Sequence, residues 1–254
     1  MPNYFAFSNV GRRYAEARPY VHPEIIARIR DSLALAWPVG CALDVACGTG
    51  QSSEALRGIA ARVVGLDPSV EMLAHAPAAP GLSYVRGQAE TLPFADASFD
   101  LVTVALAFHW LERARFLAEA RRVLTPDAWL VVYNNLFCGQ MEGNADFERW
   151  SREVYLARYP PPPRRSQPLS DAEAETGGFR FAEREDLTHW IAFTPGRLAD
   201  YMMTQTNIIA AAANGASYAD VRAWLVDAVT PMFEGVPERR FLFTSYIWYL
   251  QRLP

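Results

Sequence analysis

Ala42–Gly50, with the sequence ALDVACGTG, is a short apolar strand that runs into a glycine-containing turn. Glycine lets the backbone of Gly48 and Gly50 turn tightly and approach a ligand without a Cβ in the way. An acidic residue, Asp67, follows at the end of the next apolar run, Val63–Leu66. A glycine turn after one strand and a carboxylate after the next predict a nucleoside-binding α/β sheet.

The spacing of the glycines separates two kinds of nucleoside site. A dinucleotide-binding fingerprint, GxGxxG, needs a third glycine at the position where this chain has Ser53. The turn reads instead Ala46-x-Gly48-x-Gly50, with Asp44 two residues before it. This pattern resembles the first motif, (L)DxGxGxG, of class I S-adenosylmethionine (AdoMet) methyltransferases, with Ala46 in place of the first glycine. For the turn alone, an ordinary strand–turn–helix of another α/β protein is the alternative.

Composition limits the classes of function. The chain has 254 residues, of which 51% are hydrophobic, enough for one α/β domain with an insertion. A net charge of −4 gives no electrostatic reason to expect a nucleic-acid or membrane partner. Three cysteines without a CxxC pair and four scattered histidines predict neither a disulfide framework nor a metal site. With no recognisable signal peptide or membrane span, we expect a reduced, cytoplasmic monomer or homodimer.

Two later segments resemble the same methyltransferases, in the same order. Asp67 lies at a strand tip, where its carboxylate can accept both ribose hydroxyls of AdoMet. After the predicted strand Leu82–Arg86, residues 87–100 read GQAETLPFADASFD and resemble the family segment GDAExLPFxDxSFD. There, an amide group and a polar side chain meet the adenine. Gln88 replaces the usual aspartate, whereas Ala89 and Glu90 match.

Two more features narrow the resemblance to the methyltransferase type 11 group, which includes trans-aconitate-methyltransferase-like enzymes. One is the pair His109-Trp110 before a helix that ends RVLTPDAWLVVY, and the other is the pattern YxxxRPxxxP that starts at Tyr14. The resemblance covers about residues 10–135. It implies a Rossmann-like seven-stranded α/β sheet with the last strand antiparallel and with helical cap insertions.

The predicted elements follow hydrophobic periodicity and punctuation by proline, glycine and capping residues. The predicted helices are Pro23–Ala36, Gln51–Arg57, Val70–Ala76 (capped by Ser69), Glu112–Leu124, Met141–Tyr159, Pro195–Met203, Asn207–Ala213 and Tyr218–Phe233. The predicted strands are Arg62–Asp67, Leu82–Arg86, Leu101–Ala107, Trp129–Tyr133 after a turn at Thr125–Asp127, Phe179–Phe193 and Arg240–Leu250. These elements suggest an N-terminal lid and helix (1–36), an AdoMet-binding core (37–137), a helical cap insertion (138–178), and C-terminal strands with inserted cap helices (179–254).

The resemblance and the strand ends together nominate the site residues. The predicted cofactor-binding residues are Tyr14, Arg18, Asp44, Ala46, Cys47, Gly48, Gly50, Asp67, Pro68, Met72, Gln88, Ala89, Glu90, Ala105, Phe108 and His109. The predicted substrate-binding residues are Trp110, Asn134, Phe137, Met202 and Gln205.

Several of these assignments have structural alternatives. The aromatic, basic N-terminus is either a lid, in which Arg18 meets a carboxylate, or a surface helix with an aromatic anchor. Met72 either flanks the adenine or packs its helix. His109, the candidate catalytic base because an imidazole titrates near neutrality, is otherwise a wall of the cofactor pocket. Met202 and Gln205 line the substrate pocket or simply pack the cap.

The predicted function is transfer of a methyl group from AdoMet to a small molecule, at a carboxylate or hydroxyl oxygen. Two other classes stay open at this point. One is another nucleotide-dependent enzyme, such as a dehydrogenase, against which the missing third glycine argues. The other is an AdoMet-fold protein repurposed as a non-methylating enzyme or binding protein in a biosynthetic pathway.

Overall fold

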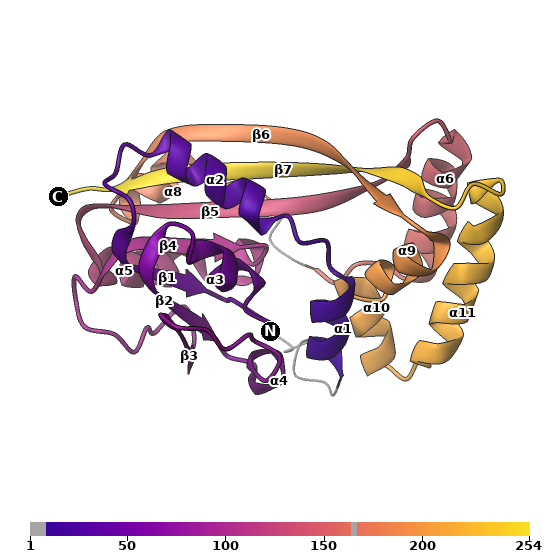
Figure 1. The fold of residues 1–254 in the computed structure, drawn as a ribbon, viewed down its shortest axis with the longest axis horizontal. Helices are drawn as coiled ribbons and strands as arrows, with labels where there is room; N and C mark the ends of the chain where they lie inside the picture. The colour runs from indigo at the N-terminus through magenta and orange to yellow at the C-terminus, as the bar shows by residue number, and fades with distance from the viewer. Residues whose placement is uncertain (1–8, 164–166) are drawn as a thin grey trace. The chain divides into compact units, whose positions relative to one another are not determined.

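The computed structural model describes residues 9–163 and 167–254 (Figure 1). Its sheet has seven strands in the order β3-β2-β1-β4-β5-β7-β6, with the last strand antiparallel, flanked by helices. The predicted Rossmann-like sheet is therefore confirmed. By its internal contacts the chain divides into two compact units. We call Tyr20–Asn134, Arg164–Asp186 and Tyr246–Pro254 the core unit, and Met1–Pro19, Asn135–Pro163 and Leu187–Ser245 the cap unit.

Parallel strands form the centre of the core unit. They are β1 (Val39–Val45), β2 (Ala60–Asp67), β3 (Leu82–Arg86) and β4 (Phe99–Ala105). In register, Val45 of β1 is opposite both Leu66 of β2 and Val104 of β4. The carboxyl ends of these three strands are therefore level, which brings the loops after them to one edge of the sheet.

The helices of the core unit are α2 (His22–Ser32), α3 (Gln51–Leu56), α4 (Val70–Leu73), the 3₁₀ turn η2 (Phe108–Trp110), α5 (Arg113–Val123) and α8 (Asp171–Thr176). Helix α5 buries Phe116, Leu117, Ala120 and Val123, the face that its periodicity predicts. Ser69 caps α4 as predicted, its Oγ accepting from the Met72 amide at 3.2 Å.

Strand β5 (Leu124–Met141) is much longer than the predicted strand Trp129–Tyr133. At the start of β5, the pairing with β4 shifts register. Phe99 is opposite Leu124, but Leu101 is opposite Trp129. The predicted turn at Thr125–Asp127 is therefore an irregularity within the strand's bounds.

The strand also does not end at Tyr133, so the predicted substrate-binding residues Asn134 and Phe137 lie within the strand rather than beyond its carboxyl end. Pairing with β7 (Arg239–Arg252) explains the extra length, because Ser245 Oγ donates to Asn135 Oδ1 at 3.1 Å and the Glu142 amide donates to the Arg240 carbonyl at 2.9 Å. Pairing with the long strand β7 keeps this part of β5 extended, although asparagines such as Asn134 and Asn135 favour a turn by themselves.

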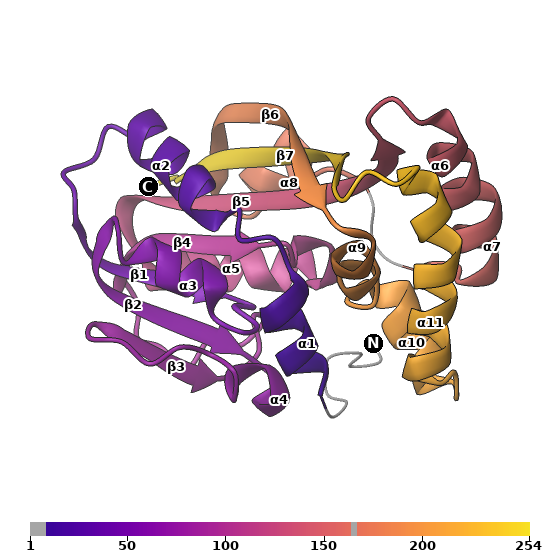
Figure 2. The same ribbon diagram turned by 45° about the vertical axis from the view of Figure 1, so that its right-hand side comes forward.

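The cap unit is mainly helical. Its helices are α1 (Val10–Ala17), α6 (Ala145–Trp150), the π-helix η3 (Ser151–Tyr155), α7 (Leu156–Arg158), α9 (Pro195–Met202), α10 (Thr206–Ala213), α11 (Tyr218–Val229) and the 3₁₀ turn η4 (Thr230–Phe233). Figure 2 shows that α6, α7, α9, α10 and α11 of this unit lie close together in space. Strand β6 (Phe179–Phe193) has the predicted bounds. Within the described residues, no helix is both long and apolar enough to cross a bilayer.

Candidate functional site

The turn after β1 requires glycine-like backbone conformations at three positions. Ala46, Gly48 and Gly50 have φ angles of 56°, 56° and 75°. A Cβ added to Gly48 would lie 3.1 Å from Cε of Met72, and one added to Gly50 would overlap the hydroxyl of Tyr84. The two glycines are therefore needed for conformation and for space, whereas Ala46 adopts the same conformation at a steric cost.

Asp67 joins the turn to the second strand. Its Oδ2 accepts a hydrogen bond from the Gly48 amide at 2.9 Å, and its Oδ1 accepts one from the Ser69 amide at 2.8 Å. A carboxylate offers about four lone-pair sites, so each oxygen keeps the capacity for one more donor. Burial raises the pKa of Asp67, and the two amide donors oppose that shift.

Asp44 is buried beneath the turn, with no exposed surface. Its Oδ2 accepts from the hydroxyls of Ser52 and Ser53 at 2.5 and 2.6 Å, and its Oδ1 accepts from Thr103 at 3.0 Å. Burial raises the pKa of Asp44 to about 6, against the effect of these hydroxyl donors. We had predicted a cofactor contact here, but with this burial Asp44 would act on a ligand only through the turn that it holds in shape.

Cys47 and Met72 pack the underside of the same turn. Cys47 is 6% exposed and its amide donates to the Leu66 carbonyl at 3.0 Å. Burial is the main cause that raises the pKa of its thiol, which therefore stays neutral. Met72 is 4% exposed, which favours the packing alternative for its side chain. Pro68 is exposed, and its carbonyl accepts from Arg86 Nε at 3.3 Å.

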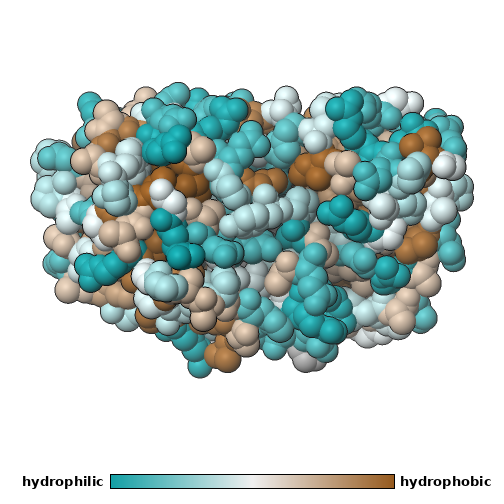
Figure 3. All heavy atoms as spheres, in the orientation of Figure 1, coloured by the Kyte–Doolittle hydropathy of each residue, from teal (hydrophilic) through white to brown (hydrophobic). Residues whose placement is uncertain are grey.

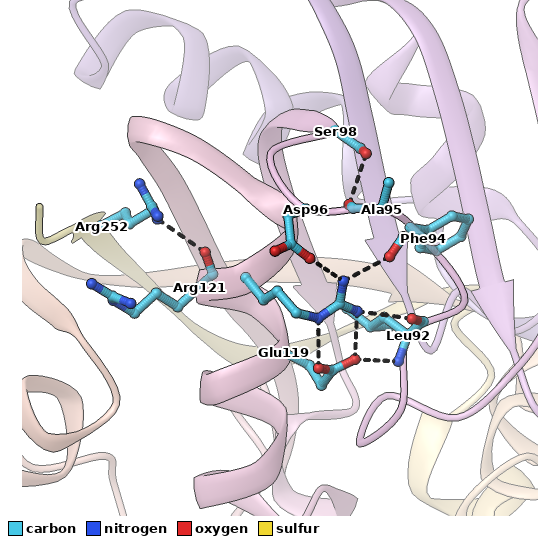
Figure 4. Close-up of polar contacts among 9 residues, drawn as sticks. Leu92, Phe94, Ala95, Asp96, Ser98, Glu119, Arg121 and Arg252 are labelled. Carbon is cyan, nitrogen blue, oxygen red and sulfur yellow. Dashed lines mark hydrogen bonds and ion pairs between the residues drawn. The ribbon is translucent and has the colours of Figure 1, made fainter.

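Arg122 of α5 fixes the loop that follows β3. Figure 4 labels its partners Leu92, Phe94, Asp96 and Glu119. Its Nη1 donates to the Phe94 carbonyl at 2.7 Å and its Nη2 to the Leu92 carbonyl at 3.0 Å. The guanidinium also pairs with Glu119 and Asp96, each at 2.8 Å. The segment LPFAD, residues 92–96, is thus anchored to α5, which holds the preceding residues Gln88–Glu90 in place.

The three residues predicted to meet the adenine have different surroundings. Gln88 is exposed, where it is free to meet a ligand. Ala89 is 5% exposed and belongs to the hydrophobic core. Glu90 accepts a hydrogen bond from the Glu112 amide at 2.9 Å, which ties the loop to the start of α5.

The segment after β4 turns at Leu106, whose φ is 59°, into η2. Phe108 is 2% exposed and packs edge-on against Phe116 and Trp248 in the core, and its contact with the cofactor stays a prediction. His109 and Trp110 are half-buried, with ring centroids 4.8 Å apart. Both follow Ala105, the last residue of β4, at the sheet edge that carries the glycine turn.

Two buried hydroxyls beside the turn were not predicted as site residues. Thr49, between the two motif glycines, and Tyr84 of β3 each have a buried oxygen without a hydrogen-bond partner among the described residues. Such a group costs about 1–3 kcal/mol until a ligand atom or a water satisfies it. For Thr49, its position between the two glycines of the sequence GTG could have indicated a site residue. No feature of the sequence indicates Tyr84.

The remaining predicted residues divide between the two units. Tyr14 and Arg18 of the cap unit lie in and just after α1, and Arg18 donates from Nη2 to the Thr204 carbonyl at 3.1 Å. Phe137 packs among cap-unit aromatic rings, Met202 has no exposed surface, and Gln205 accepts from the Tyr155 hydroxyl at 2.8 Å. In the core unit, Asn134 donates to the Tyr246 hydroxyl at 3.5 Å. Contact of any of these residues with a ligand stays a prediction.

Comparison with known proteins now adds to this geometry. Residues 43–132 match the family model Methyltransf_11, described as a methyltransferase domain. This part of the chain is therefore similar to methyltransferase domains. The matched residues run from β1 to β5 and include the glycine turn, Asp67 and the loop fixed by Arg122.

Individual relatives support the same family. A Mycobacterium bovis protein named an uncharacterized methyltransferase is 36% identical over 131 residues, 51% of this chain and 52% of that protein. The malonyl-[acyl-carrier protein] O-methyltransferase of Erwinia pyrifoliae is 34% identical over 160 residues, 61% of this chain and 59% of that protein. The chain thus spans between half and three fifths of the length of these curated relatives.

A solved structure extends the similarity in fold to nearly the whole chain. It is a protein of Anaeromyxobacter dehalogenans provisionally described as a type II methyltransferase, with a TM-score of 0.67 and 26% identity. The match covers 93% of this chain and 97% of the other. The residues of the cap unit are therefore included in a fold that recurs in another protein.

AdoMet is the cofactor of class I methyltransferases, and the residues here fit it. The free lone pairs on both oxygens of Asp67 suit two adjacent ribose hydroxyls. Gly48 is half-buried rather than enclosed, and without a Cβ its backbone is open to a close ligand approach. Among the residues that the structure describes, no group of three or more His, Cys, Asp or Glu could hold a metal ion.

Proposed function

We propose that this chain transfers a methyl group from AdoMet to a carboxylate or hydroxyl oxygen of a small molecule. The single observation that supports it best is the hydrogen bond of 2.9 Å from the Gly48 amide to Asp67, because it joins the glycine turn to the carboxylate suited to ribose. We further propose that the protein works in the cytoplasm, as a monomer or homodimer, without a nucleic-acid partner. The narrower resemblance to trans-aconitate methyltransferases stays a prediction.

Different residues would hold different parts of the cofactor. Asp67 would accept the ribose hydroxyls, Gly48 and Gly50 would let the backbone lie against the ligand, and Gln88 would meet the adenine. AdoMet, when bound, supplies an electrophilic methyl group on a good leaving group. The chain then has to hold the acceptor in line with that methyl group and exclude water. Positioning of this kind contributes up to roughly 7–11 kcal/mol in favourable systems.

Proton chemistry depends on the acceptor. A carboxylate is already a nucleophile and needs no base, whereas a phenol or enol gains from one. We propose His109 as the base in the second case, because its half-buried ring follows β4 at the sheet edge that carries the glycine turn. A His109→Gln variant would then have a lower kcat with a phenol or enol acceptor, while its KM for AdoMet would stay close to that of the parent.

Calorimetric titration of the protein with AdoMet tests the cofactor proposal. The Asp67→Asn variant replaces one acceptor oxygen by an NH₂ group, so we expect its affinity to fall by about tenfold or more, the worth of one charged hydrogen bond. The matched control is Asp96→Asn, since the Asp96 side chain is 78% exposed and pairs, among the described residues, with the anchoring Arg122. No binding by the parent protein, or equal affinity of both variants, would refute the proposal.

The alternative function is that of an AdoMet-fold protein that no longer transfers methyl groups. Incubation of the protein with methyl-labelled AdoMet and a cell extract separates the two. A labelled small-molecule product supports methyl transfer, whereas cofactor binding without any labelled product across a broad metabolite panel supports the alternative.

A further inference from the structure

The cap unit contains a cavity of about 420 Å³ that the methyl-transfer proposal does not use. Helices α1, α9 and α11 form it, and both α1 and α11 contact α9. Its charged lining residues are Arg13, Glu16, Arg18, Arg197, Asp200 and Arg222. Hydrophilic residues gather over the region of α1 on the molecular surface (Figure 3). Cavities of this size, roughly 300–1,000 Å³, are typical of small-molecule sites.

The charges of this lining do not balance. Arg222 is held by Asp200 through two hydrogen bonds, at 2.6 and 3.2 Å, so this pair is neutral. Three arginines then face one carboxylate, Glu16, which leaves an excess of two positive charges. In the described ranges, none of the three arginines forms an ion pair, and residues 1–8 and 164–166 contain no aspartate or glutamate in their sequence.

Arg13 and Arg18 are held in place without satisfying all their donors. The guanidinium carbon of Arg13 lies 3.8 Å from the centre of the Tyr218 ring, and its Nη1 is buried without a hydrogen-bond partner among the described residues. Arg18 lies over the Tyr14 and Tyr201 rings, at 4.7 and 5.2 Å, and its buried Nε likewise lacks a partner in that part of the chain. A buried, charged donor without an acceptor is costly, and an anion would remove this cost.

We propose that this cavity binds a small organic anion through a carboxylate or phosphate group. Planar guanidinium groups fit both kinds of oxyanion with paired hydrogen bonds, so Arg13 and Arg197 would hold the charged end. Met203 and the Tyr218 ring supply an apolar wall, so the ligand has an apolar body as well as a charged head. Every residue that carries the inference belongs to the cap unit, and Arg18 is the one lining residue that is also a predicted cofactor-binding residue.

Titration of the full chain with phenyl phosphate and with benzoate tests the proposal and distinguishes the two oxyanions. Benzyl alcohol serves as the neutral probe of the same size. We expect at least one anion to bind with a Kd in the millimolar range or tighter, and benzyl alcohol to bind at least tenfold more weakly. Absence of anion binding, or equal binding of the neutral probe, would overturn the proposal.

Variants on one helix supply the matched control. Arg13→Gln removes a lining arginine, whereas Arg12→Gln removes its exposed neighbour in α1, which does not line the cavity. We expect the first to weaken anion binding at least tenfold and the second to leave it unchanged. Arg197→Gln, at an exposed position in α9, repeats the test where a folding defect is least expected. Equal affinities of the Arg12 and Arg13 variants would contradict the site.

A final titration tests whether this cavity binds a separate anion or the carboxylate group of AdoMet. The anion is titrated again in the presence of saturating AdoMet. Unchanged anion affinity supports a separate site, whereas competition between the two ligands means that the cavity receives part of the cofactor and overturns the proposal. If AdoMet itself does not bind, the proposed function fails, but the anion titration without AdoMet still decides this inference.

Discussion

Ala46 occupies a backbone conformation that favours glycine, with φ at 56° in the turn after β1. It stands where the family motif has its first glycine. We expect Ala46→Gly to raise the free energy of unfolding by about 0.5–1 kcal/mol, since relief of roughly 1–2 kcal/mol of strain exceeds the roughly 0.4–1 kcal/mol of added chain entropy. Urea unfolding measures this difference.

Ala55→Gly is the matched control for that substitution. Ala55 lies in helix α3, outside the residues with positive φ, so glycine brings only its entropy cost there, roughly 0.5–1 kcal/mol of lost stability. If both variants lose stability to the same extent, the strain assigned to Ala46 is absent.

The contribution of Asp44 to the free energy of unfolding should fall as pH rises, which is opposite to the behaviour of most carboxyl groups. Its pKa is about 6 in the folded chain, against an ordinary value of 3.8. Between these values the folded state binds the extra proton, so the free energy of unfolding falls as pH rises through this window and is constant above it. The two pKa values correspond to a total fall of roughly 3 kcal/mol.

The Asp44→Asn variant isolates this contribution. Other carboxyl groups titrate in the same range, but they do so in both proteins. The difference in unfolding free energy, parent minus variant, should therefore decrease as pH rises from about 4 to about 6. A difference that stays constant across this range would show that Asp44 has an ordinary pKa in the folded chain.

At the scale of elements, Arg122 determines whether the loop after β3 keeps its shape. The Arg122→Met variant removes its bonds to the Leu92 and Phe94 carbonyls and leaves the Glu119 carboxylate without that partner. We expect a loss of about 2 kcal/mol in the free energy of unfolding, because bonds to charged groups are worth about 1.5–3 kcal/mol and this side chain is partly exposed.

Arg115→Met is the control on the same helix. The Arg115 side chain is 78% exposed and its contact with Glu112 is at 3.7 Å, so the change in stability should stay within about 0.5 kcal/mol. Limited proteolysis locates the effect of the Arg122 variant, which should increase cleavage between residues 92 and 98. A similar loss of stability in both variants would argue against an anchoring role for Arg122.

The elements also show what local sequence can and cannot predict. Leu82–Arg86 and Phe179–Phe193 have the predicted bounds, because turn residues or a change in periodicity mark both ends of each. Helix α8 was missed, although Ser170 and Glu173 form a capping box in the sequence SDAE. The length of β5 could not be predicted, because it depends on pairing with β7, about a hundred residues later.

The same contrast applies to the site. Gly48, Gly50 and Asp67 could be predicted because they serve a turn and a strand tip, which local sequence specifies. The roles of Phe108 and Arg122 could not, since burial and loop anchoring depend on contacts with distant elements. Motif letters shared with a family therefore mix ligand contacts with residues that hold the loops in shape.

At the scale of the whole molecule, each compact unit has its own hydrophobic core. Leu43, Val102 and Phe116 belong to the core-unit cluster, and Phe147, Tyr201 and Phe241 belong to the cap-unit cluster. The cap unit is assembled from three segments that are far apart in the sequence. Hydrophobic periodicity predicted helices in its second and third segments but did not predict α1, and no local pattern states which distant segments share a core.

The two cores predict a local response to the cofactor. A ligand that binds only the folded state adds about 2.7 kcal/mol of stability when its concentration is a hundred times its Kd. The added stability protects the segments that must be folded for the ligand to bind. Because Asp67 and the glycine turn belong to the core unit, AdoMet should slow amide exchange most strongly in β1, β2 and the turn between Val45 and Gln51. Hydrogen exchange read by mass spectrometry measures the slowing, by up to about a hundredfold. The Asp67→Asn variant at the same AdoMet concentration should show much less protection in these segments, and equal protection of β1 and α11 in the parent would contradict this placement of the cofactor.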